Sequence, residues 1–69
     1  MPEYKITVDG MTCGHCEAAV TQALQDLAGV QRVEVDLDKG EATVETEARV
    51  EPEQLLASVR EEGYEATLQ

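Results

Sequence analysis

Apolar and polar residues alternate along the N-terminal segment. Tyr4, Ile6 and Val8 are each followed by a polar residue, and this period of two predicts a strand with one buried face that ends near Asp9. Residues 10–14 include two glycines and break the alternation. We therefore expect a loop after the first strand.

The next segment changes to the period of a helix. Its apolar residues recur three and four positions apart, which predicts a helix with one buried face. We expect this helix to start close to Cys16 and to be stopped at Gly29, since glycine readily takes the positive φ that follows a helix. The apolar positions are Ala19, Val20, Ala23, Leu24 and Leu27.

Alternation returns on both sides of Gly40. A glycine between two alternating segments is typical of a hairpin turn, so we expect two antiparallel strands joined there. The inward positions are Val33, Val35 and Leu37 before the turn and Ala42, Val44 and Thr46 after it.

The C-terminal part predicts a second helix and a short last strand. Pro52 suits the first turn of a helix, and Gly63 marks its end. The apolar face of this helix comprises Leu55, Leu56 and Val59, and Ala66 and Leu68 are expected in the short last strand.

The predicted order of elements is βαββαβ, within a single domain that covers residues 1–69. Right-handed crossovers place both helices on the same face of the sheet. We therefore expect an α+β fold of ferredoxin-like type, a two-layer sandwich in which a four-stranded antiparallel sheet carries two helices on one face. The other face is expected to be polar, as in other one-sided sheets, with Lys5, Thr7, Glu34, Asp36, Thr43 and Glu45.

Charge excludes several classes of partner. Fifteen acidic residues against five basic give a formal charge of −10, which repels nucleic acid and anionic lipid surfaces. The N-terminal residues lack the pattern of a signal peptide, and no apolar stretch approaches membrane-spanning length. We expect a soluble cytoplasmic protein that neither binds nucleic acid nor inserts into a membrane.

The candidate site is the sequence Gly-Met-Thr-Cys-Gly-His-Cys at residues 10–16. Cys13 and Cys16 are too close in sequence to staple a fold, so in a reducing compartment the pair indicates metal binding or redox chemistry. A helix N-terminus favours thiolates, and thiolates select soft ions. Because a closed zinc site needs more ligands than two, copper(I) fits the pair best.

This motif resembles the Gly-Met-Thr-Cys-x-x-Cys signature of the heavy-metal-associated domain family, and in particular of CopZ-type bacterial copper chaperones. The resemblance extends over the whole chain, including the Gly-Tyr-Glu segment at residues 63–65. It implies that Cys13 and Cys16 carry copper(I) and deliver it to the metal-binding domain of a copper-transporting P-type ATPase or to a copper-responsive regulator. It also implies that Met11 is a buried anchor for the loop and that Tyr64 lies beside the metal.

Other residues could tune the site. Met11, Thr12, His15 and Tyr64 are the candidates. We interpret Met11 chiefly as a packing residue and His15 chiefly as a solvated loop side chain, with a ligand or tuning role as the alternative. Tyr64 could cover the metal loop or simply pack in the core. We expect the metal-free protein to be a monomer, with a metal-bridged dimer as the alternative for the loaded form.

Two alternative functions remain. The same fold could carry zinc or mercury(II). The Cys-Gly-His-Cys sequence also resembles that of protein disulfide isomerase, but that fold is longer, Thr12 stands where an aromatic residue is usual, and neither Pro2 nor Pro52 is placed to face the dithiol. Since no catalytic constellation surrounds His15, we expect a carrier and not an enzyme.

Overall fold

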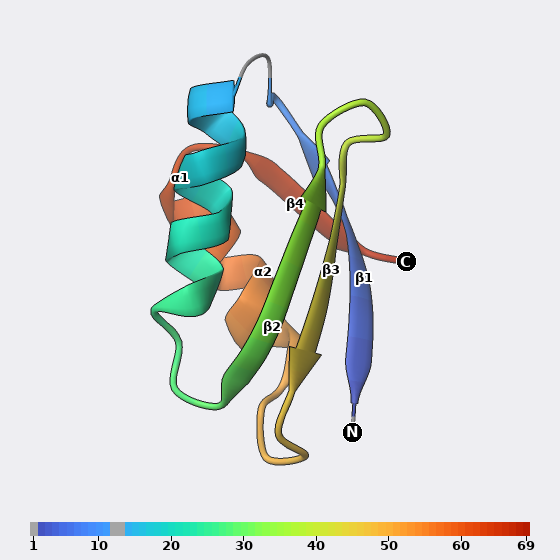
Figure 1. The fold of residues 1–69 in the computed structure, drawn as a ribbon, viewed down its shortest axis with the longest axis vertical. Coiled ribbons are helices and arrows are strands. Elements are labelled where there is room, and N and C mark those ends of the chain that lie inside the picture. Colours follow the sequence, from blue (N-terminus) through green and yellow to red (C-terminus); the bar gives the residue numbers. More distant parts are fainter. Residues whose placement is uncertain (1, 12–13) are drawn as a thin grey trace.

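The structure is a computed structural model that describes residues 2–11 and 14–69. The strands and helices follow the predicted βαββαβ order (Figure 1). The elements are β1 (Glu3–Asp9), α1 (Gly14–Gln25), β2 (Val30–Asp36), β3 (Glu41–Thr46), α2 (Pro52–Glu61) and β4 (Glu65–Leu68).

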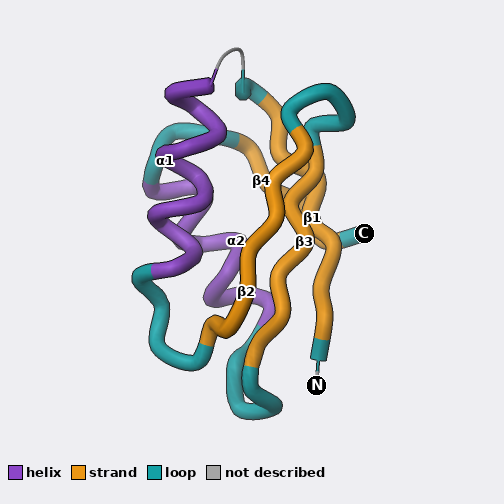
Figure 2. Tube along the Cα trace, in the orientation of Figure 1, coloured by secondary structure: helices purple, strands orange, loops and turns teal. Residues whose placement is uncertain are grey.

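In the described part of the chain the strands form one four-stranded sheet in the order β2-β3-β1-β4. Every neighbouring pair is antiparallel; Ile6, for example, lies opposite Ala42 on β3 and opposite Leu68 on β4. Both helices cover the same face of this sheet (Figure 2). The predicted ferredoxin-like sandwich is confirmed.

The core lies between the sheet and the two helices. Ile6 and Val8 on β1, like Ala42 and Val44 on β3, alternate with more exposed residues, as their period of two predicted. Burying a Leu or Ile side chain contributes about 1.5–3 kcal/mol. The buried apolar residues are Ile6, Val8, Val20, Leu24, Ala42, Val44, Val50, Leu55, Leu56, Val59 and Ala66.

Helix α1 differs from the prediction at both ends. It begins at Gly14, before the expected start near Cys16, and ends at Gln25. The first-turn residues Gly14 and His15 are exposed, so the pattern of apolar positions carried no signal for them. Leu27 lies in the turn that follows and still packs against the core, with its N–H donating to the carbonyl of Leu24 at 3.2 Å.

One further expectation needs correction at a strand end. Leu37 lies beyond the end of β2, in the turn of the hairpin. Leu68 belongs to β4 as expected; it is 44% exposed and lies outside the core. Strand β4 therefore contributes Ala66 alone to the buried cluster.

The hairpin between β2 and β3 reaches back to β1. Gly40 has a φ of +66°, which suits glycine at a tight turn, and its carbonyl accepts a 2.7 Å hydrogen bond from the N–H of Val8. The tip of the hairpin therefore lies beside the end of β1 from which the motif begins.

None of the helices described is long and apolar enough to cross a membrane.

Candidate metal centre

The end of β1 and the start of α1, which flank the cysteine motif, lie at one end of the molecule (Figure 1). Cys16 is half-buried in the first turn of α1, as predicted. Cys13 and Thr12, the other predicted site residues of this segment, lie outside the described residues. Within the described part of the chain, no group of three or more His, Cys, Asp or Glu side chains is arranged to hold a metal ion.

The position of Cys16 has an electrostatic consequence. Helix α1 has 12 residues, and the N–H groups of a first helical turn have no partners within the helix. They and the helix dipole place partial positive charge at this end, which stabilises anionic ligands such as thiolates. Cys16 therefore occupies a position where a thiolate, the form that binds a cation, is stabilised.

Met11 and Tyr64 are the two further predicted site residues that contact the core. Both are half-buried, and both pack against the core cluster. Met11 precedes the motif cysteines on the strand side, while Tyr64 comes from the connection between α2 and β4. Residues far apart in sequence thus pack against the same core cluster.

Gly10 and Tyr64 are in close contact. Gly10 has a φ of +102°, and a Cβ atom at this position would lie 3.3 Å from Cδ1 of Tyr64. The tyrosine ring therefore lies directly against the start of the segment that leads to the cysteines. A side chain at Gly10 would meet both an unfavourable backbone conformation and this ring.

His15 is exposed in the first turn of α1. The sequence placed it in a loop; the structure places it in the helix, with its side chain in contact with solvent. Exposure agrees with the solvated interpretation of this residue.

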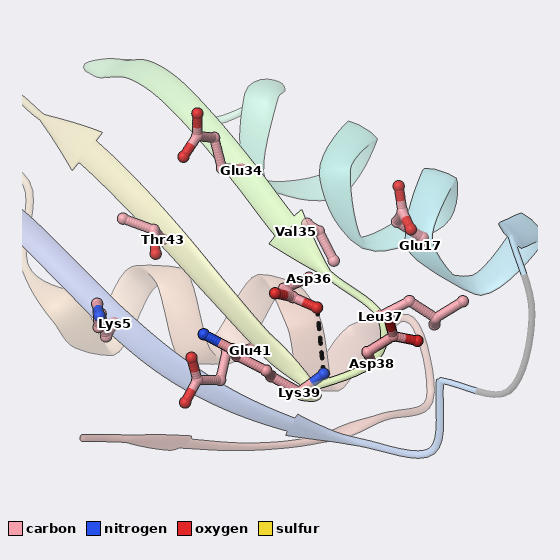
Figure 3. Close-up of a pocket in the computed structure, with 10 residues that line it drawn as sticks. All are labelled: Lys5, Glu17, Glu34, Val35, Asp36, Leu37, Asp38, Lys39, Glu41 and Thr43. Carbon is pink, nitrogen blue, oxygen red and sulfur yellow. Dashed lines mark hydrogen bonds between the residues drawn. The ribbon is translucent and has the colours of Figure 1, made fainter.

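Acidic residues surround this end of the molecule. Asp9, Glu62 and Glu65 are exposed, and Glu17 is half-buried in the first turn of α1. The sequence did not predict the hollow of about 580 Å³ beside it, shown in Figure 3, which extends from Glu17 onto the sheet. Its lining residues are Lys5, Glu17, Glu34, Val35, Asp36, Leu37, Asp38, Lys39, Glu41 and Thr43.

Arg32 on β2 offsets the charge of one carboxylate on the open face of the sheet. Arg32 forms an ion pair with Glu34 on the open face, and the hydrogen bond to Glu34 followed by the attraction of neighbouring carboxylates raises the pKa of Arg32. Because both side chains of this pair are largely exposed, the pair contributes little to stability. Its main effect is to neutralise one carboxylate of the face.

Comparison with known proteins agrees with the fold. The model of the heavy-metal-associated domain matches residues 5–65, and the chain belongs to this family. It is similar to "Copper chaperone CopZ" of Staphylococcus haemolyticus, with 46% identity over 61 residues that cover 87% of this chain and 90% of the relative. The CopZ of Staphylococcus aureus strain MRSA252 is 35% identical over 94% of this chain and 97% of its own.

Solved structures lead to the same family. A CopZ metallochaperone superimposes with a TM-score of 0.92 at 31% identity, covering 96% of this chain and 100% of its own. A copper-binding domain of HMA7, a P-type ATPase, superimposes with a TM-score of 0.97 at 30% identity, covering 100% of this chain and 95% of its own. The resemblance stated from the sequence is confirmed.

Proposed function

We propose that this protein is a copper chaperone that carries copper(I) on the thiolates of Cys13 and Cys16. The observation that carries the proposal is the placement of Cys16 in the first turn of α1, three residues after Cys13, in a chain whose relatives are named copper chaperones. Two soft ligands at a helix N-terminus suit a soft monovalent ion. The proposed unit is a single domain over residues 1–69 that acts as a carrier and not as an enzyme, in the cytoplasm.

The proposed transfer is a ligand exchange. Copper(I) held by two thiolates is under-coordinated, so a cysteine thiolate of the partner can add before either original bond breaks. A three-sulfur intermediate forms, one of the two original thiolates leaves, and the second follows as the partner's other cysteine binds. Each departing thiolate can take up a proton as each incoming thiol loses one, and the ion is never released to water.

Neighbouring residues are proposed to shape this exchange without binding the metal. Tyr64, which lies against Gly10, would limit access of water to one side of the ion. Met11, packed against the core, would hold the base of the loop. Thr12 and His15 flank Cys13 and Cys16 in sequence, and the exposed His15 would act at most on the charge around the sulfurs.

The proposed recipient is the metal-binding domain of a copper-transporting P-type ATPase, with a copper-responsive regulator as the alternative. Likeness to the copper-binding domain of HMA7 supports the first choice, because two domains of the same shape can present their cysteine pairs to each other. We propose a monomer for the metal-free protein, with a metal-bridged dimer as the alternative state of the loaded form.

Docking is expected to depend on charge. Asp9, Glu17, Glu62 and Glu65 surround the candidate site, so a partner should present a basic face. Raising ionic strength from about 0.01 M to about 0.15 M shortens the Debye length from roughly 30 Å to roughly 8 Å and should slow copper transfer to the partner domain. Stopped-flow transfer rates at both salt concentrations test this expectation, and an unchanged rate would exclude electrostatic docking.

A competition titration tests the function itself. The reduced protein is expected to take one equivalent of copper(I) from a high-affinity chelator and to bind zinc(II) much more weakly under matched competition. Equal or stronger binding of zinc(II) would contradict the copper assignment and favour a carrier of another thiophilic metal. Reduction of insulin disulfides by the metal-free protein would instead support the redox alternative.

A further inference from the structure

The connection between α2 and β4 is held by a side-chain hydrogen bond as well as by a backbone hydrogen bond. Arg60, in the last turn of α2, donates from Nη2 to the carbonyl oxygen of Ala66 on β4 at 2.8 Å. The N–H of Gly63 also donates to the carbonyl of Arg60 at 3.0 Å. Tyr64 lies between these two attachments.

Strand geometry explains why the Ala66 carbonyl is available to Arg60. In an antiparallel pair, alternate residues direct their backbone groups toward the partner strand. The N–H of Gln69 donates to the carbonyl of Lys5 on β1 at 2.9 Å, and Ala66 lies opposite Val8 in the same register. By this alternation Gln69 faces β1 and Ala66 faces the outer edge of the sheet, where the Arg60 guanidinium takes the place of water.

Tyr64 transmits this restraint to the candidate metal centre. Its ring lies against Gly10, where a Cβ would come within 3.3 Å of Cδ1. The side-chain hydrogen bond of Arg60 is to Ala66 on β4. Tyr64 is thus the side chain of this connection that lies next to the loop.

We propose that Arg60 is a positioning residue for the metal loop: by tying the end of α2 to β4, it fixes the Tyr64 ring against Gly10. This inference rests on the proposed function for its effect on copper, but not for its effect on Gly10. When the tie is lost, the ring is held less firmly beside the loop. An incoming ligand then reaches the metal more easily, so copper should leave faster.

Arg60→Met tests the proposal, because methionine keeps an apolar stem and removes the donor. Arg60→Lys restores a cationic donor. Arg49→Met is the matched control, since Arg49 pairs with Glu47 at 3.1 Å in the connection between β3 and α2, at the opposite end of the molecule (Figure 1). Both positions tested, Arg60 and Arg49, are exposed, so all three variants should retain the fold, and thermal unfolding checks this.

The first measurement is the amide chemical shift of Gly10 in the metal-free, isotope-labelled protein, which is sensitive to the ring current of Tyr64. Arg60→Met is expected to move it, Arg60→Lys to return it close to wild type, and Arg49→Met to leave it unchanged. Mere loss of stability would lower the melting temperature without moving this resonance in the folded state. A Gly10 resonance in Arg60→Met that coincides with wild type overturns the proposal.

The second measurement is the rate at which a chelator removes copper(I). Loss of one hydrogen bond should make removal from Arg60→Met roughly threefold faster, toward the lower end of what such a bond contributes, whereas Arg49→Met should match wild type. Equal rates for Arg60→Met and wild type would also overturn the proposal. Failure of the wild-type protein to bind copper(I) would contradict the proposed function alone, and the Gly10 measurement would still decide the role of Arg60.

Discussion

Cys16→Ser is expected to lower the affinity for copper(I) by roughly a hundredfold to a thousandfold. Structural zinc sites with four ligands bind with about 10–16 kcal/mol, or about 2.5–4 kcal/mol per ligand, and each 1.4 kcal/mol is about tenfold in affinity. Removing one of two sulfurs should cost a similar amount, because the serine hydroxyl is a hard, neutral donor. Chelator competition measures the change, and Cys13→Ser should behave alike.

Ala18→Ser is the matched control for this experiment. Ala18 is exposed in α1, so the substitution adds the same hydroxyl to the same helix without touching a sulfur. Its affinity should equal that of wild type. If Cys16→Ser retained wild-type affinity, the metal would have to be held elsewhere and the two-thiolate site would be wrong.

Gly29→Ala should be the most destabilising of the conservative glycine changes in this chain. Gly29 has a φ of +94°, and a Cβ there would come within 2.5 Å of Cγ2 of Val50, a residue that is only 4% exposed. Backbone strain costs about 1–3 kcal/mol, and crowding of a packed core adds about 1–3 kcal/mol. For a domain of this size such a sum approaches the whole free energy of unfolding.

Gly63→Ala separates the two contributions. Gly63 has nearly the same φ, +95°, but nothing lies within 4 Å of a Cβ placed there, so it reports backbone strain alone. Thermal unfolding should place Gly29→Ala about 10 °C below Gly63→Ala, since 1 kcal/mol shifts the melting temperature of a small domain by about 4–8 °C. Equal melting temperatures would mean that Val50 moves aside at negligible cost. In a Val50→Ala background the difference should shrink.

Most of the fold could be predicted because its elements follow simple periods. Ile6 and Val8 alternate with polar residues in β1, and Leu55, Leu56 and Val59 share one buried face of α2. Pro52 and Gly63 mark the two ends of α2 as predicted, and Glu51 completes its start through a capping box with Gln54. These signals are local, so the sequence alone was enough to read them.

Expectations were wrong at the ends of helices and strands, which the period of apolar residues does not define. The exposed first turn of α1 offers no apolar residue to mark its start at Gly14. Leu68 shares the period of Ala66 in β4, yet it is 44% exposed while Ala66 is buried. Periodicity assigns a side chain to a face and does not say whether anything covers it there.

The candidate site divides in the same way. The motif identified Cys16 and its place in the first turn of a helix, because cysteine spacing and a strand-to-helix junction are both visible in the sequence. The bond from Arg60 to Ala66 carries no such signal, since an arginine near a helix end is common on any surface. Only the fold brings its guanidinium to the outer edge of β4.

The sheet order has a consequence for synthesis of the chain. Strand β1, which leads into the cysteine motif, lies between β3 and β4, so its second neighbour comes from residues 65–68, at the end of the chain described here. Pairing between strands far apart in sequence forms late, because the chain loses the entropy of the closed loop before the stabilising contacts are made. A nascent chain therefore cannot complete the sheet on both sides of β1 until residues 65–68 have emerged from the ribosome.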